Sequence, residues 1–246
     1  MKLPMIKITL GLLVAVCMTS MPVTAYQYSM TSVYVYDNPP PGSSLPYANE
    51  IHTTVRNWLT GAPGWTERFY EFNPYVEDTD FGSQNSGYQG LDEADLHYHF
   101  GHGININGES HVKYKDYPNS DLVRGDVYKK WDLTNKWVIF DACEVLANLQ
   151  WGGALKYSHG ILGFSTEKTP SPALPDNFLR YSIDNDYTLG ASWKHATQDI
   201  YPSGVTARVV FDTQDQLQND HLSGQGYVAP NENPDDDVIY YDEWTC

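Results

Sequence analysis

The residues WVIFDAC, at positions 137–143, decide the fold of this chain. A run of large apolar residues such as Trp137–Phe140 is typical of a short strand that is buried on both faces, as in the middle of a parallel sheet. The run ends in Asp141-Ala142-Cys143, so a carboxyl group and a thiol follow directly after it. The stretch therefore predicts a central strand that carries a reactive side chain to the edge of a sheet.

A second stretch, LHYHFGHG at positions 96–103, also has a strand-like run followed by a potentially reactive side chain. Residues 95–100 are predicted to form a strand that ends in Gly101-His102-Gly103. In open sheets of parallel strands, the ligand crevice lies beyond the carboxyl ends of the strands. If these two strands are neighbours, His102 and Cys143 emerge at the same edge.

Strand and helix patterns alternate along the rest of the chain. Strands are predicted at 32–36, 65–72, 160–164 and 205–211, helices at about 44–59, 144–156, 176–183 and 190–200, and a long loop at 104–135. This alternation predicts an α/β fold, a three-layer sandwich in which a mostly parallel central sheet is covered on both faces.

The first 25 residues have the pattern of a secretory signal peptide. Lys2 and Lys7 supply positive charge, and the apolar run Ile8–Met18 is too short to span a membrane. Small residues precede the expected cleavage point after Ala25, so we expect a secreted, extracellular or cell-surface protein. A short membrane anchor that stays attached is the alternative, and no later stretch is suited to cross a bilayer.

Signal removal leaves one domain, predicted at residues 26–230, and an acidic tail at residues 231–246 that we expect to be mobile. Loss of Lys2 and Lys7 changes the net charge from −16 to −18. Such a surface repels nucleic acid and anionic lipid and favours cationic ligands, although solubility alone also accounts for it.

The pairing of His102 with Cys143 predicts nucleophilic catalysis. A thiol attacks as the thiolate, and an imidazole can take the thiol proton and later protonate the leaving amine. The backbone N–H groups of Gly103 and Cys143 could together form an oxyanion hole. The helix predicted to begin beside Cys143 would also favour the thiolate.

These two motifs resemble those of the caspase-like (clan CD) cysteine peptidases, which include caspases, metacaspases, legumains and gingipains. LHYHFGHG is similar to their strand ending in Ser-Gly-His-Gly, and WVIFDAC to their apolar strand ending in an acidic or amide residue, any residue and Cys. The resemblance implies a caspase-like fold, with His102 as general base and acid, Cys143 as nucleophile and Gly103 in the oxyanion hole. Phe100 stands where Ser is frequent, and Glu144-Val145-Leu146 replaces the His-Ser-Gly of metacaspases, which indicates a divergent exported branch.

The same resemblance implies that Asp141 lines a substrate-binding pocket for Arg or Lys. Capping of the following helix is the alternative role for this carboxylate. Cys143 and Cys246 are the cysteines left after signal removal, and a disulfide between them would block catalysis by Cys143.

Three functions are open at this point. The first is a secreted cysteine endopeptidase that uses His102 and Cys143 on a peptide or protein substrate, with no cofactor, no metal and no nucleic-acid partner. The second is an inactive binding module on the same fold. The third is a zinc hydrolase, because His97, His99 and His102 form His-x-His-x-x-His, to which Cys143 or His159 could add a ligand.

Simple packing is the alternative role for His97 and His99. We expect His159 to be structural, because it lies at the amino end of its predicted strand. The sequence leaves the oligomeric state open.

Overall fold

The computed structural model describes residues 26–37, 44–84, 90–132, 134–232 and 238–246, so the predicted signal peptide lies outside the described residues. Its main element is a seven-stranded sheet with the order β10-β9-β8-β7-β3-β1-β2. In this sheet the neighbouring strands β8, β7, β3, β1 and β2 are all parallel, whereas β9 is antiparallel to both β8 and β10. The strands are β1 (Tyr26–Ser32), β2 (Trp65–Phe72), β3 (Leu96–Phe100), β7 (Trp137–Asp141), β8 (Gly160–Phe164), β9 (Thr206–Phe211) and β10 (Tyr240–Thr245).

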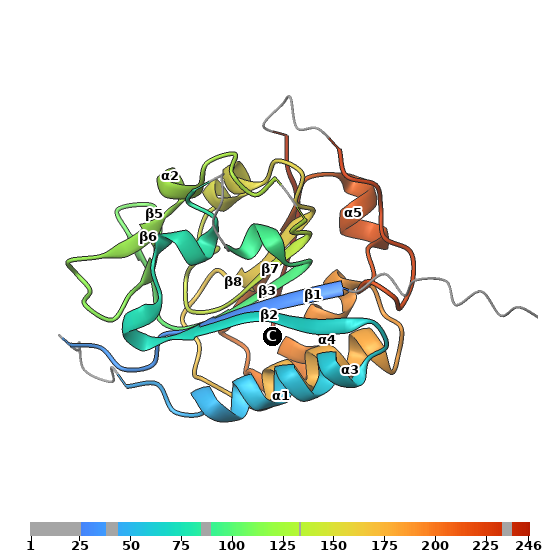
Figure 1. Ribbon diagram of the computed structural model, residues 1–246, viewed down its shortest axis with the longest axis horizontal. Helices are drawn as coiled ribbons and strands as arrows, with labels where there is room; N and C mark the ends of the chain where they lie inside the picture. Colours follow the sequence, from blue (N-terminus) through green and yellow to red (C-terminus); the bar gives the residue numbers. More distant parts are fainter. Residues whose placement is uncertain (1–25, 38–43, 85–89, 133, 233–237) are drawn as a thin grey trace, which may run out of the picture.

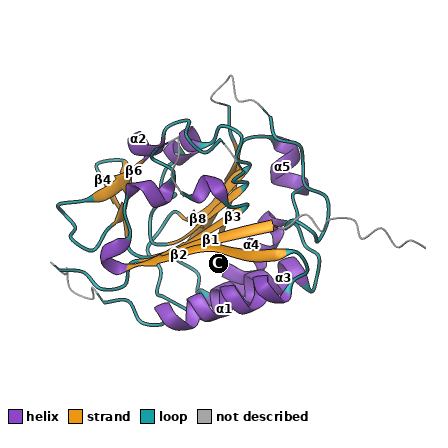
Figure 2. Cartoon of the chain, in the orientation of Figure 1, coloured by secondary structure: helices purple, strands orange, loops and turns teal. Residues whose placement is uncertain are grey.

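Helices and a second, smaller sheet cover the two faces of the main sheet (Figure 1, Figure 2). One face carries α1 (Ala48–Gly61), α3 (Ala173–Ile183) and α4 (Leu189–Ile200). The other face carries the short helix α2 (Arg124–Val127), several 3₁₀ turns and a three-stranded sheet made of β4 (Gly103–Ile106), β5 (Glu109–Lys113) and β6 (Asp121–Val123). Helix α5 (Gln214–Asn219) follows β9. The predicted three-layer α/β plan with a mostly parallel central sheet is confirmed.

Strand β7 shows why the sequence adopts this plan. Successive side chains of a strand point to opposite faces. Trp137 and Ile139 accordingly pack with the helices α1, α3 and α4, while Val138 and Phe140 pack with the small sheet, and all four are fully buried. A strand with a core on each side therefore needs an uninterrupted apolar run.

Two predicted segments differ from the structure near the site. The predicted loop at 104–135 contains β4 (Gly103–Ile106), β5 (Glu109–Lys113) and β6 (Asp121–Val123). Asn107 and Gly108 have φ values of 54° and 89°, and Asn-Gly favours the tight hairpin turn that joins β4 to β5. The first strand is Tyr26–Ser32, not 32–36.

The predicted helix at 144–156 does not form. Glu144 has a left-handed φ of 55°, and the N–H groups of Glu144 and Leu146 donate to Thr166 O and Phe164 O instead of to a helical partner. Only a short 3₁₀ helix, Gln150–Ala154, follows. The competing backbone partners lie at and after the end of β8, so tertiary pairing overrides the helical pattern here.

The C-terminal residues also differ from the prediction of a mobile tail. Residues Tyr240–Thr245 form the edge strand β10, paired with β9. Trp244 is buried, and its Nε1 donates a 2.9 Å hydrogen bond to Thr197 Oγ1 on α4. The central sheet thus continues beyond residue 230. In the described part of the chain, no helix is both long and apolar enough to cross a membrane.

A buried polar cluster ties the segment after α5 to the amino edge of the sheet. The Asp220 carboxylate accepts from His159 Nδ1 at 2.7 Å, Trp137 Nε1 at 2.9 Å and the Ala229 N–H at 2.8 Å. His159 and Asp220 are fully buried. His159 therefore has a structural position, as expected, far from the carboxyl edge.

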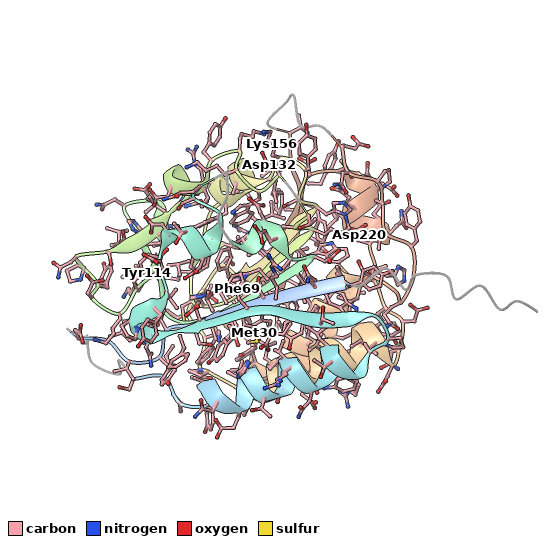
Figure 3. The ribbon with its side chains drawn as sticks, viewed as in Figure 1. Met30, Phe69, Tyr114, Asp132, Lys156 and Asp220 are labelled. Atoms are coloured by element: carbon pink, nitrogen blue, oxygen red, sulfur yellow. The ribbon has the colours of Figure 1, made fainter. Side chains whose placement is uncertain are left out.

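We expect Asp220→Ala to lower the free energy of unfolding by about 3–5 kcal/mol, because a buried imidazole and two N–H donors lose their acceptor. The matched control is Lys156→Ala, which breaks a surface pair with Asp132 and should cost less than about 1 kcal/mol. Figure 3 labels Asp220, at the right, and both members of the surface pair, Lys156 and Asp132, at the top. Urea unfolding measures both losses, and equal losses would contradict this assignment.

Candidate active site

Strands β3 and β7 are direct neighbours, parallel and in register, with Phe100 opposite Asp141. His102 and Cys143 each follow two residues after this pair, so they leave the sheet at the same level of its carboxyl edge. Both residues line one pocket, with Leu45 and Lys168 among its other walls, and the pocket has a volume of about 220 Å³. The structure therefore brings the predicted histidine and cysteine together.

His102 is held from the side by Tyr36, which follows the neighbouring strand β1. The His102 backbone N–H donates to Tyr36 Oη at 2.8 Å, and Tyr36 in turn donates to Val33 O at 2.8 Å. The rings of Tyr36 and His102 have centroids 5.0 Å apart and are tilted by 49°. Tyr36 is thus a positioning residue for His102.

The backbone around Cys143 forms a tight turn that the small sheet supports. Ser110 Oγ donates to Glu144 O at 2.9 Å, and the Asn105 N–H donates to a Glu144 carboxylate oxygen at 3.3 Å. Because no helix begins here, the expected stabilisation of the thiolate by a helix N-terminus is wrong. The left-handed Glu144 instead turns the chain so that it runs beside β4.

Gly103 lies directly against this turn. A Cβ atom at Gly103 would sit 2.1 Å from the carbonyl oxygen of Cys143 and 2.6 Å from a methyl group of Val145. Only glycine permits this approach of β4 to the Cys143 backbone. The structure thus places the two residues of the predicted oxyanion hole side by side, and their catalytic role stays a prediction.

The Cys143 sulfur is engaged by the backbone of Lys168. The Lys168 N–H donates to Sγ at 3.3 Å, and the thiol donates to Lys168 O at 3.3 Å. Burial raises the pKa of the Cys143 thiol, while the hydrogen bond from Lys168 and the lysine charge act in the opposite direction. Cys143 and Cys246 are both free thiols, so the disulfide alternative is wrong.

Asp141 is fully buried, and its carboxylate is shared by two partners. Lys168 Nζ forms an ion pair with one oxygen, and Tyr98 Oη donates to the other at 2.9 Å. The lysine side chain is 2% exposed and runs over the rings of Phe100 and Phe164, with Nζ 5.9 and 5.4 Å from their centroids. The acidic group expected to receive a basic side chain thus already holds one from the same chain.

His97 and His99 face the opposite side of the sheet from Phe100 and pack on Phe81. Both ring nitrogens of His97 hydrogen-bond to hydroxyl groups, Nδ1 to Ser29 at 2.8 Å and Nε2 to Thr31 at 3.0 Å. Across the described residues, no three His, Cys, Asp or Glu side chains gather as a metal ion would require. These two histidines therefore occupy packing positions rather than the ligand positions of the zinc hypothesis.

Sequence reasoning identified His102, Gly103, Asp141 and Cys143, and the structure gathers them at one edge. Sequence reasoning missed Lys168, which lies just after the buried strand 160–164, at the same edge as these four residues. The rule that the carboxyl ends of parallel strands bound the crevice could have flagged it. Tyr36 was predicted to lie in a strand at 32–36, and no sequence motif indicated its contact with His102.

The fold and the site define an α/β protein with a histidine and a thiol at the carboxyl edge of a mostly parallel sheet. The chain belongs to the family described as Domain of unknown function (DUF6345), whose model matches residues 34–244. None of the curated proteins matches this sequence.

The solved structures that are similar to this chain include a caspase and a secreted cysteine protease. The crystal structure of the Drosophila initiator caspase Dronc is 10% identical, with a TM-score of 0.43, over 70% of this chain and 72% of that chain. A secreted C11 cysteine protease from Bacteroides thetaiotaomicron, solved in complex with an irreversible peptide inhibitor, is 15% identical, with a TM-score of 0.46, over 76% of this chain and 66% of that chain.

The buried histidines predict acid sensitivity. Burial lowers the pKa of His97 well below its usual value and that of His99 to about 3, so both are neutral in the folded protein. In the unfolded chain both histidines become protonated below about pH 6.5. Their contribution to the free energy of unfolding is therefore fully present above that pH and is lost as the pH drops towards 3. We expect His99 to account for about 2 kcal/mol of lost stability between pH 7 and pH 5, and His97 to act in the same direction.

Urea unfolding of His99→Gln at the two pH values tests this expectation. The pH dependence should become shallower by about 2 kcal/mol relative to the unsubstituted chain, because one titrating group is gone. His195→Gln, at an exposed histidine, is the control and should leave the dependence unchanged. An unchanged dependence in His99→Gln would contradict the neutral buried state.

Proposed function

We propose that this protein is an exported cysteine endopeptidase in which His102 and Cys143 form the catalytic pair. The observation that carries the proposal is the in-register pairing of β3 with β7, which brings both side chains to one pocket. The two sequence motifs, in the same order as in caspase-like peptidases, support it independently.

The reaction follows from the chemistry of the two groups. His102 takes the thiol proton as the Cys143 sulfur attacks the carbonyl carbon of the scissile bond, and the oxyanion is bound by the N–H groups of Gly103 and Cys143. The carbon–nitrogen bond breaks as His102 protonates the leaving amine. Water, deprotonated by His102, then hydrolyses the thioester, and the proton returns to the sulfur.

Cleavage after a basic residue is the specificity that we propose. Asp141 is a buried carboxylate two residues before Cys143, and the cation that pairs with it, Lys168 Nζ, lies beside the rings of Phe100 and Phe164. A carboxylate with no access to water needs a cationic partner. A substrate lysine or arginine side chain supplies that partner in the same place.

An inactive binding module is the second candidate, and one observation favours it. The Cys143 thiol has a raised pKa and is engaged by the Lys168 backbone, which is not the state of a ready nucleophile. Labelling experiments separate the two candidates, since an inactive module keeps its fold but gives no reaction of Cys143 with peptide-based electrophiles.

For the export part of the proposal, residues 1–25 serve as a signal peptide that is removed. We expect the protein recovered from the medium or cell surface of its host to begin at Tyr26, because small residues occupy the cleavage positions. Mass spectrometry of its N-terminal peptide measures this. A chain that keeps Met1 or Lys2 and stays with the membrane fraction would favour the uncleaved anchor.

The catalytic pair is tested by substitution. We expect Cys143→Ala to abolish peptide hydrolysis and His102→Ala to lower kcat/KM about 10²- to 10⁴-fold, because the first removes the nucleophile and the second its base. Iodoacetamide should inactivate the enzyme, whereas EDTA should not. Hydrolysis of a mixed peptide library, followed by mass spectrometry, measures the activity and the residue cleaved.

The matched controls are Cys246→Ala, at the other free thiol, and His195→Ala, at an exposed histidine. Both should keep the activity of the unsubstituted chain. Activity that survives Cys143→Ala, or that is lost equally in Cys246→Ala, would contradict the proposed pair.

A further inference from the structure

The chain after β8 makes a strap across the site. Thr166 anchors its start, since Thr166 O accepts from the Glu144 N–H at 3.2 Å and Thr166 Oγ1 from the Thr206 N–H at 2.8 Å. Glu167 and Thr169, on either side of Lys168, are exposed. Among the described residues, every hydrogen bond from residues 167–172 to a distant part of the chain is made by Lys168, to Cys143 or Asp141. The hydrogen bonds that fix this strap, residues 167–172, to distant described parts of the chain are therefore all at the site.

Lys168 engages both groups that a basic substrate would use. Its backbone N–H and carbonyl pair with the thiol of Cys143, and its side chain reaches the Asp141 carboxylate. The remaining pocket, about 220 Å³, is smaller than the roughly 300–1,000 Å³ typical of ligand sites. The site as it stands is partly filled by the chain's own residue.

We propose that Lys168 is an intramolecular occupant of the substrate site, and that residues 167–172 must swing away from Cys143 and Asp141 before a peptide can bind. This inference rests on the proposed peptidase function and adds a regulatory step to it. The segment competes with substrate for the same carboxylate and the same sulfur. Because it is tethered, it competes at a high effective concentration.

Asp141 is paired with a cation both before the strap opens and after a basic peptide has bound. Asp141 without a cation would be an isolated buried charge, which is costly. When Lys168 leaves, the basic side chain of an incoming peptide replaces it on Asp141, while the released lysine returns to water. A neutral side chain offers no such replacement, so the strap should open for basic peptides in preference to neutral ones.

The main test measures how fast Cys143 is alkylated by two peptidyl acyloxymethyl ketones, one ending in lysine and one in the uncharged, similarly shaped norleucine. In each, the sulfur displaces a carboxylate and forms a thioether, so no reagent beyond the probe is needed. We expect Lys168→Met to react at least about tenfold faster with the lysine probe than the unsubstituted chain, because the tethered competitor is gone. Lys168→Arg keeps the charge and should stay within about twofold of the unsubstituted rate.

Two controls keep this test decisive. Lys156→Met removes a surface lysine that pairs with Asp132 and should change neither rate. The double variant Lys168→Met with Asp141→Asn removes both members of the buried ion pair, so no unpaired buried charge is left to cause misfolding. It should react equally with the lysine and norleucine probes, because no buried charge remains to be paired. Unchanged or slower labelling of a folded Lys168→Met by the lysine probe would overturn the inference.

A second measurement does not depend on catalysis. Lys168→Ala removes the side chain beyond Cβ, which has the composition of propylammonium. We expect this cation to bind at Asp141 in the variant and to raise the Tm of the variant by about 2–4 °C. 1-Propanol should not do so, and neither compound should affect the unsubstituted chain. Rescue by propylammonium without labelling by any peptidyl probe would support the exchangeable pocket and contradict the peptidase. No rescue and no faster labelling would contradict the occupant role of Lys168.

Discussion

The in-register pairing of β3 with β7 is the constraint on which the rest of the site depends. Phe100 and Asp141 stand opposite each other, so the chain continues at the same level from both strands. A slip of one residue would turn every side chain of β7 to the other face of the sheet. The two-sided core around β7 forbids that slip, because Trp137 and Ile139 fill one layer and Val138 and Phe140 the other. Packing far from the site thus fixes the relation between His102 and Cys143.

The neighbouring strands complete the rim in the same way. The segment after β1 brings Tyr36 to His102, and the segment after β8 brings Lys168 to Cys143 and Asp141. The small sheet supports the turn at Glu144 from the side. A buried carboxylate at this rim has to be paired, and in this structure the pairing cation comes from within the chain. The same electrostatic requirement underlies the proposed occupation of the site by Lys168 and the proposed preference for basic peptides.

The central strands and helices could be predicted from the sequence because their signals are local. Continuous apolar runs marked β7 and β8, and helical spacing marked α1, α3 and α4. The helix predicted at 144–156 failed because its first N–H groups find partners at and after the end of β8, which no local pattern reveals. The hairpin of β4 and β5 was missed although Asn107-Gly108 is a turn signal, since its strands are short and mixed in polarity.

The candidate site was predictable to the extent that it follows from motifs. His102, Gly103, Asp141 and Cys143 sit in two short stretches and were assigned together. Lys168 has no motif, and its role depends on a three-dimensional contact between segments that follow different strands. The tail was misjudged because its acidic run at 235–237, which lies outside the described residues, is typical of a mobile segment. Tyr240–Thr245 has no alternating pattern, and it becomes a strand through its pairing with β9 at the sheet edge.

The distance between Cys143 Sγ and the nearest ring nitrogen of His102, in a crystal structure of the chain alkylated at Cys143 by the lysyl probe, tests the account most directly. We predict about 3–4 Å, with the lysine side chain of the probe on Asp141 and Lys168 displaced. A separation of more than about 7 Å, roughly two hydrogen-bond lengths, would contradict the claim that the two strands supply one catalytic pair.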